Sequence, residues 1–150
     1  MNSKILFLCF LLVLFSCSEH KRNNTANSTV DIERQADSLY YAKNDVLAIP
    51  LYSKLISEDS TKGKYYLNRG YSYTILLNAY PAIQDFLKSI QLNYRVAESN
   101  RNIAVNYFSI DDSLAVYYIN KSYQLNPNDS SVKNLKQKYE MQLIKDKLNQ

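Results

Sequence analysis

The chain has 150 residues and a formal net charge of +4, a length that accommodates one modest domain. It contains only 2 glycines and 3 prolines, too few turn formers for a many-stranded sandwich or barrel, so long helices joined by short turns are favoured. The basic excess comes from five lysines after residue 132 and lacks the dense, arginine-centred stripe that binds nucleic acid. We therefore expect no nucleic-acid partner.

The first seventeen residues, MNSKILFLCFLLVLFSC, have the pattern of a targeting segment. Lys4 precedes an apolar run from Ile5 to Phe15, which is about half the length that crosses a bilayer as a helix. The run closes at Cys17 and is followed by polar sequence. This pattern resembles a bacterial lipoprotein signal peptide, and the resemblance implies that residues 1–16 are cleaved and that Cys17 is lipidated. The alternative is an ordinary secretory signal with an incidental cysteine.

The segment after the signal, residues 17–28, is polar and is predicted to be a disordered tether. Removal of Cys9 with the signal would leave Cys17 as the last cysteine, so no disulfide could form within the mature chain. In the resembling lipoproteins the residue after the cysteine influences the choice of membrane, and Ser18 is not the aspartate that retains them at the inner membrane. We expect a lipid-anchored protein of the bacterial cell envelope, at the outer membrane and facing the periplasm.

A pattern of small and large residues recurs about every 34 residues along the middle of the chain, which predicts stacked supersecondary units. Helix axes approach to about 8–10 Å only where the crossing residues are small, so we expect each unit to be a helix pair that crosses at the small residues. Large residues keep the same spacing and fill the space beside the crossing. The small residues are Ala36, Gly70 and Ala104, then Ala48, Ala82 and Ala115; the large ones are Leu39, Tyr73 and Tyr107, then Tyr52, Phe86 and Ile119.

The period and residue types resemble the tetratricopeptide repeat (TPR) family from about Thr29 to Asp129; the alternative is an unrelated helical bundle. The resemblance implies an all-α solenoid of about three helix-turn-helix repeats, at residues 29–62, 63–96 and 97–129. The middle unit carries it best, through Tyr66, Arg69, Gly70, Tyr73, Ala82, Phe86 and Ser89, and the third through Ala104, Tyr107, Ala115, Ser122 and Pro127.

Two further features concern individual helices. Pro50 lies within the second helix of the first unit, and its missing N–H predicts that this helix starts late or bends there. Residues 130–150 are predicted to form a capping helix, apolar on one side and polar on the other, with Asp129 or Ser130 as its N-cap. Its lysines are interpreted as a solvated face, with contact to an acidic lipid or partner as the alternative. Its apolar stripe is Val132, Leu135, Tyr139 and Leu143.

Catalytic equipment is nearly absent from the sequence. The single histidine, His20, lies in the tether, so no imidazole base can be built on the repeats. Asp111 and Asp112 form an adjacent acidic pair, which is interpreted as the cap of the following helix. We therefore expect no catalytic residues, no metal site, no cofactor and no enzymatic activity.

The resemblance implies that the first helices of successive units line a concave groove that takes extended peptides or partner helices. Tyr40, Tyr71 and Phe108 are predicted to form an aromatic strip in it, or else only to cover the stack. The groove residues implied by the resemblance are Glu33, Asp37, Tyr40, Lys64, Leu67, Asn68, Tyr71, Glu98, Arg101, Asn102, Val105 and Phe108.

Related domains that clamp an acidic peptide C-terminus use Lys and Asn in unit one, Asn in unit two, and Lys and Arg in unit three. The matching positions here agree only at Asn68, so a basic or apolar segment is favoured over an acidic tail. We expect a membrane-anchored adaptor that binds a protein segment. A structural component that uses its stack edges, a protein that captures a glycan or peptidoglycan fragment, and a homodimer remain open. The other matching positions are Glu33, Asp37, Glu98 and Asn102.

Overall fold

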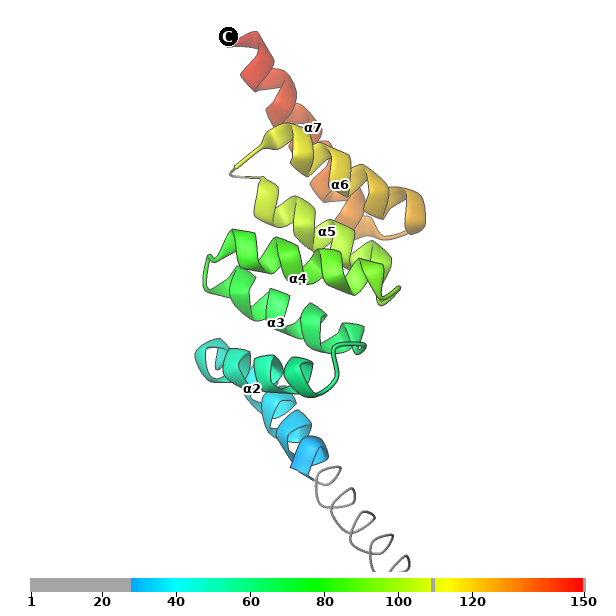
Figure 1. Cartoon of the computed structure of the whole chain (residues 1–150). Coiled ribbons are helices and arrows are strands. Elements are labelled where there is room, and N and C mark those ends of the chain that lie inside the picture. The colour runs from blue at the N-terminus through cyan, green and yellow to red at the C-terminus, as the bar shows by residue number, and fades with distance from the viewer. Residues whose placement is uncertain (1–27, 109, 150) are drawn as a thin grey trace, which may run out of the picture.

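The computed structural model describes residues 28–149 apart from residue 109, and these residues contain helices and no strand. The signal peptide, the tether and Cys17 lie outside the described residues. Figure 1 shows helices stacked one upon the next, with residue 28 and the C-terminal end at opposite ends of the stack. The helical segment 28–41 is followed by α2 (Asp45–Glu58), α3 (Gly63–Ile75), α4 (Ala79–Gln91), α5 (Val96–Tyr107), α6 (Asp112–Leu125) and α7 (Ser130–Leu148). The predicted all-α stack of helix pairs is confirmed.

Gly70 shows why the repeat needs a small residue at the helix crossing. A Cβ placed on Gly70 would lie 2.9 Å from Cε1 of Phe86, closer than carbon atoms normally approach. Phe86 is fully buried, so its ring lies directly on the α3 backbone at Gly70 rather than beside the crossing. The other predicted small residues are also fully buried: Ala36, Ala48, Ala82, Ala104 and Ala115.

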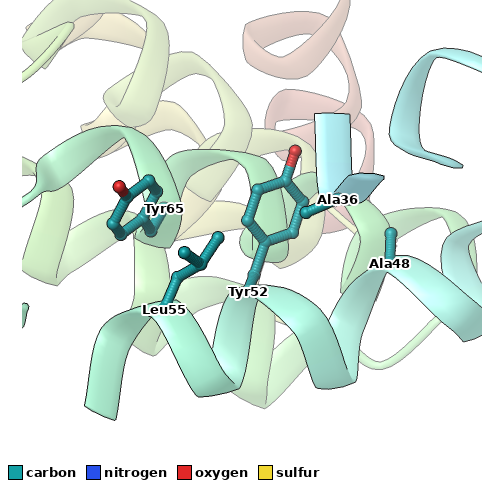
Figure 2. Close-up of a cluster of buried hydrophobic side chains, with 5 residues drawn as sticks. All are labelled: Ala36, Ala48, Tyr52, Leu55 and Tyr65. Atoms are coloured by element: carbon teal, nitrogen blue, oxygen red, sulfur yellow. The ribbon is translucent and has the colours of Figure 1, made fainter. Parts of the chain in front are cut away.

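The core of the first unit joins three helices (Figure 2). Tyr52 and Leu55 extend from α2, Tyr65 comes from α3, and Ala36 and Ala48 leave room for the Tyr52 ring between the helices. The Tyr52 side chain is fully buried, a position that requires a partner for its hydroxyl. The Tyr52 hydroxyl donates to Asp37, so this tyrosine connects the apolar core to a polar cluster on the neighbouring surface.

A buried ion pair ties α3 to α4 in the middle unit. Nε and Nη2 of Arg69 each donate to a different carboxylate oxygen of Asp85 at 2.8 Å, and Nη1 donates to Oγ of Ser53 on α2 at 2.9 Å. Burial raises the pKa of Asp85, and the hydrogen bonds from Arg69 oppose that rise. The pair therefore links three helices through one guanidinium group.

The helix ends agree with the predicted caps, whereas one of the two effects predicted for Pro50, a late start of the helix, is not observed. Asp111 caps α6 by accepting from the Leu114 N–H at 2.9 Å, and Asp129 caps α7 by accepting from the Ser131 N–H at 2.9 Å. The helix α2 begins at Asp45 and continues through Pro50, so the prediction of a late start is wrong. Pro50 is exposed, and the carbonyl that loses its helical partner belongs to a residue on the solvent side.

Candidate peptide-binding groove

Two adjoining hollows lie along the stack, the first formed by residues 28–41, α3 and the start of α5, and the second by α5, the end of α6 and the start of α7. The first has a volume of about 300 Å³ and the second, which extends toward α7, about 450 Å³. Both are lined by Arg95 and Glu98, so they meet at this pair, and we call them together the groove. The first hollow is also lined by Tyr40, Tyr41, Lys64, Leu67, Asn68, Tyr71 and Tyr94, and the second by Val96, Ala97, Arg101, Ser122, Asn126, Asp129 and Val132.

Seven of the twelve predicted groove residues line one hollow or the other, from Tyr40 in the first unit to Arg101 in the third. Three residues of the first hollow were not predicted, namely Tyr41, Tyr94 and Arg95. Tyr41 is 76% exposed and directly follows Tyr40, which was predicted. Its position next to Tyr40 could therefore have identified it from the sequence. Arg95 has a left-handed backbone with φ of 45°. Because arginine rarely adopts this conformation, the sequence did not indicate a turn at this position.

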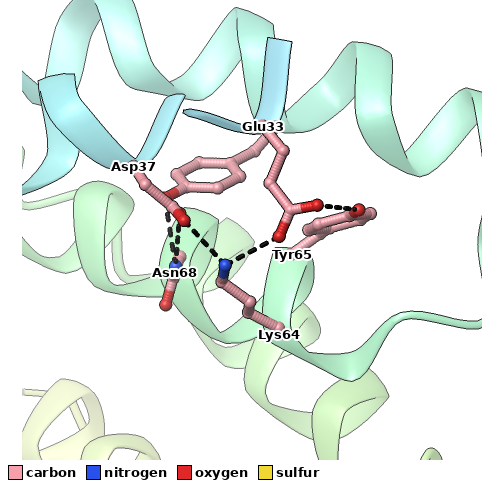
Figure 3. A network of polar contacts seen from close by, with 6 residues as sticks. Glu33, Asp37, Lys64, Tyr65 and Asn68 are labelled. Carbon is pink, nitrogen blue, oxygen red and sulfur yellow. Dashed lines mark hydrogen bonds and ion pairs between the residues drawn. The ribbon is translucent and has the colours of Figure 1, made fainter. Parts of the chain in front are cut away.

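The two acidic residues predicted for unit one are engaged by Lys64 (Figure 3). Nζ of Lys64 donates to Oε1 of Glu33 and to Oδ2 of Asp37, each at 2.7 Å. The other oxygen of Glu33 accepts from the Tyr65 hydroxyl at 2.9 Å, and the other oxygen of Asp37 accepts from the Tyr52 hydroxyl at 2.8 Å. All four carboxylate oxygens therefore already have donors from the protein.

Burial lowers the pKa of Lys64, but its hydrogen bonds to Asp37 and Glu33 outweigh this and raise the pKa overall. Burial, together with the hydrogen bond to Glu33, raises the pKa of Tyr65 to about 12. The lysine is thus charged and the tyrosine neutral throughout the physiological range. Figure 3 also shows Asn68 beside this cluster, where its amide donates to the Tyr52 hydroxyl at 3.0 Å.

A second polar network crosses the centre of the groove. The Tyr71 hydroxyl donates to Oε1 of Glu98 at 2.7 Å, and Nη1 of Arg95 donates to Oε2 of the same carboxylate at 2.9 Å. Nη2 of Arg101 donates to the Tyr71 hydroxyl at 3.2 Å. Burial and the hydrogen bond to Glu98 raise the pKa of Tyr71. This network forms a polar bridge between the two hollows.

The predicted aromatic strip is only half formed. The rings of Tyr40 and Tyr71 lie together, with centroids 6.3 Å apart. Phe108 instead stacks on Tyr139 of α7, with centroids 4.3 Å apart and planes tilted by 19°. The prediction that Phe108 belongs to this strip is wrong, because the capping helix covers one face of its ring and Lys138 lies 4.8 Å from its centroid.

The groove as a whole is close to electrically neutral. Glu33, Asp37, Glu98 and Asp129 supply four negative charges, and Lys64, Arg95 and Arg101 supply three positive charges. Glu33, Asp37 and Glu98 accept hydrogen bonds from cations or tyrosines, and Asp129 accepts from N–H groups at the start of α7, so little negative potential is left for a ligand. Four tyrosines, Tyr40, Tyr41, Tyr71 and Tyr94, are among the residues that line the first hollow, and tyrosine rings are rigid and amphipathic contacts. Of the remaining predicted residues, Asn102 is buried and Val105 is exposed.

Residues 28–149, leaving out residue 109, contain no group of three or more His, Cys, Asp or Glu side chains placed to hold a metal ion. Within that same part of the chain, no helix has both the length and the apolar character needed to span a bilayer.

Comparison with protein-family models found no match, and none was found among curated proteins. Solved structures do match. The first TPR domain of the Spaghetti protein (RPAP3) bound to an HSP90 peptide superposes with a TM-score of 0.72 at 18% identity, over 77% of this chain and 93% of that one. The chain has a tetratricopeptide repeat fold.

Two further TPR domains show the same likeness. The OM64 TPR domain of Arabidopsis has a TM-score of 0.71 at 16% identity, over 76% of this chain and 95% of that chain. The TPR2B domain of yeast Sti1, in a complex with pHsp70, has a TM-score of 0.67 at 16% identity, over 76% of this chain and 97% of that chain. At such low identity the shared property is the TPR fold, and nearly the whole length of these domains is matched.

Proposed function

We propose that this TPR chain is a non-catalytic adaptor that binds a segment of a partner protein in the groove. The observation that carries the proposal is the pair of adjoining hollows, the first of them lined by Tyr40, Tyr41 and Tyr71, whose charged neighbours are already bonded to protein groups. Structural neighbours with this fold support it, since one is bound to an HSP90 peptide and another is in a complex with pHsp70.

The partner segment that suits this groove is apolar rather than strongly charged. The carboxylates that favoured a basic segment are neutralised by Lys64 and Arg95, so a basic segment would gain little from them. The HSP90 peptide of the matched Spaghetti domain, SRMEEVD, ends in acidic residues. At the positions that would clamp such an end, this chain has Glu33 and Asp37 in the first unit, so we propose that it does not take an acidic tail.

We further propose that lipidation at Cys17 holds the adaptor at the bacterial cell envelope, at the outer membrane and facing the periplasm. The support is the sequence pattern that closes at Cys17, which lies outside the described residues. Labelling cells with a palmitate analogue tests this point. The wild-type chain should carry the label and fractionate with membranes, whereas Cys17→Ser should be unlabelled.

Crosslinking of the tagged full chain in its own cells tests the groove. The groove variant combines Tyr41→Ser and Arg101→Gln, because both residues line the hollows and neither is buried. The matched control is Tyr80→Ser, a change of the same kind at a 67% exposed tyrosine of α4 that lines neither hollow. We expect a discrete protein partner to be captured by the wild type and the control and lost from the groove variant. A partner that the groove variant keeps would contradict the groove proposal.

A further inference from the structure

The capping helix α7 has a second apolar stripe that faces away from the stack. Its buried residues, Val132 and Tyr139, pack on the third unit, as predicted. Met141, Ile144 and Leu148 follow one another at helical spacing on the opposite side, and they are 58%, 58% and 79% exposed. The prediction of a polar outer face is therefore wrong for the second half of α7.

Lysines flank this stripe on both sides. Lys133 and Lys147 lie on one side of it and Lys138 and Lys145 on the other, as a period of 3.6 residues per turn places them, although the Lys138 ammonium turns back over the Phe108 ring. Within residues 28–149, residue 109 excepted, none of these four forms an ion pair, whereas Lys136 pairs with Glu140. The outer face thus combines exposed apolar groups with unneutralised positive charge.

The geometry of α7 leaves this face accessible. The helix has 19 residues and packs on α6, which has 14. Figure 1 shows its C-terminal turns projecting beyond the end of α6, with no further helix on their outer side. In a solenoid each helix buries its apolar stripe against the next, so an apolar outer stripe on the last helix is a surface for one more.

We propose that the outer face of α7 docks an acidic amphipathic helix of a partner protein. The apolar stripe of that helix would cover Met141, Ile144 and Leu148, and its Asp and Glu side chains would meet the flanking lysines. A second copy of this chain fits less well, because two such faces would bring lysines against lysines. A lipid surface also fits less well if Cys17 is lipidated as proposed, because residue 28, the described residue nearest to Cys17 in sequence, lies at the opposite end of the stack from α7 (Figure 1).

The test uses two synthetic helical peptides of about 20 residues, long enough to form helix on their own. Both carry the same leucine stripe, one flanked by Glu and the other by Lys. Their binding to the full chain is measured by fluorescence anisotropy at low and high salt. The stripe variant is Met141→Gln, Ile144→Gln and Leu148→Gln, and the charge variant is Lys145→Gln with Lys147→Gln. The control is Val46→Gln with Leu47→Gln, which changes exposed apolar residues of α2.

We expect the Glu peptide to bind at least about tenfold more tightly than the Lys peptide, and more weakly at high salt. The stripe and charge variants should each lose about tenfold in affinity, with unchanged helical circular dichroism, while the α2 control binds normally. Equal binding of the two peptides, or binding that the stripe variant retains, would overturn the proposal. So would a dimer in sedimentation that the stripe variant abolishes, or preferential binding of the Cys17→Ser chain to phosphatidylglycerol vesicles that the stripe variant loses.

Discussion

The two ends of the stack use their charges in opposite ways. At the N-terminal end Lys64 bridges Glu33 and Asp37, and every carboxylate oxygen of this cluster accepts a hydrogen bond from the protein. At the C-terminal end Lys145 and Lys147 make no ion pair with any described residue, and they lie beside exposed apolar side chains.

The difference separates charge that stabilises the fold from charge that is available to a partner. A simple count of the acidic residues predicted for the groove favours a basic ligand. Two of them, Glu33 and Asp37, instead pair with Lys64 and hold the first unit against α3. A simple count of the lysines of α7 favours an ordinary solvated face, but in the structure they lie on both sides of an exposed apolar stripe. Whether a charge recognises a ligand therefore depends on its existing partners more than on its sign.

Removal of one partner of a buried ion pair should lower the free energy of unfolding more than any other change considered below. Arg69→Met would leave the Asp85 carboxylate buried without its partner, and we expect the free energy of unfolding to fall by about 3 kcal/mol. The double variant Arg69→Met with Asp85→Leu should recover most of that loss, because no charge is then left buried. Urea denaturation of the three chains measures both effects. A single variant as stable as the wild type would show that the pair does not stabilise the fold.

The half-exposed cluster at the N-terminal end should show a smaller effect. Lys64→Met removes the cation between Glu33 and Asp37, and we expect a loss of about 1 kcal/mol at neutral pH. Because the pKa of Lys64 is raised in the folded chain, its contribution is fully present below its ordinary value of 10.5. The contribution is lost as the pH rises through the folded pKa, so the two chains should converge in strongly alkaline solution. Thermal unfolding at several pH values measures this, and a gap that widens above pH 10.5 would contradict it.

The smallest effect should come from the boundary between α6 and α7. A hydrogen bond with the Asp146 carboxyl raises the pKa of Asp112. The folded chain therefore holds this proton more tightly, and the resulting stability is present at acidic pH and lost as the pH rises through the folded pKa. Asp146→Asn should stabilise the chain at neutral pH, where the two carboxylates repel, and the gain should be only a few tenths of a kcal/mol because both side chains are partly accessible to solvent. The difference should vanish near about pH 3 in thermal unfolding.

The amino-acid sequence by itself determined the architecture, because the repeat is encoded in residue size. Two helices can cross closely only where the side chains are small, so Gly70 and Ala82 identify the crossing within the middle unit. The spacing of about 34 residues then locates the equivalent crossing in the next unit. The helix caps at Asp111 and Asp129 were equally legible, since a cap acts on N–H groups within three residues of itself.

Only the tertiary structure decided which surfaces are free. Lys64 lies 27 residues from Asp37 and the Tyr71 hydroxyl meets a carboxylate 27 residues away, so these bonds depend on how neighbouring helices rotate against each other. The same rotation placed Phe108 under Tyr139 and turned Met141, Ile144 and Leu148 outward. The helical periodicity of the sequence shows that a helix has an apolar and a polar face, but contacts between helices distant in sequence decide which residues are covered.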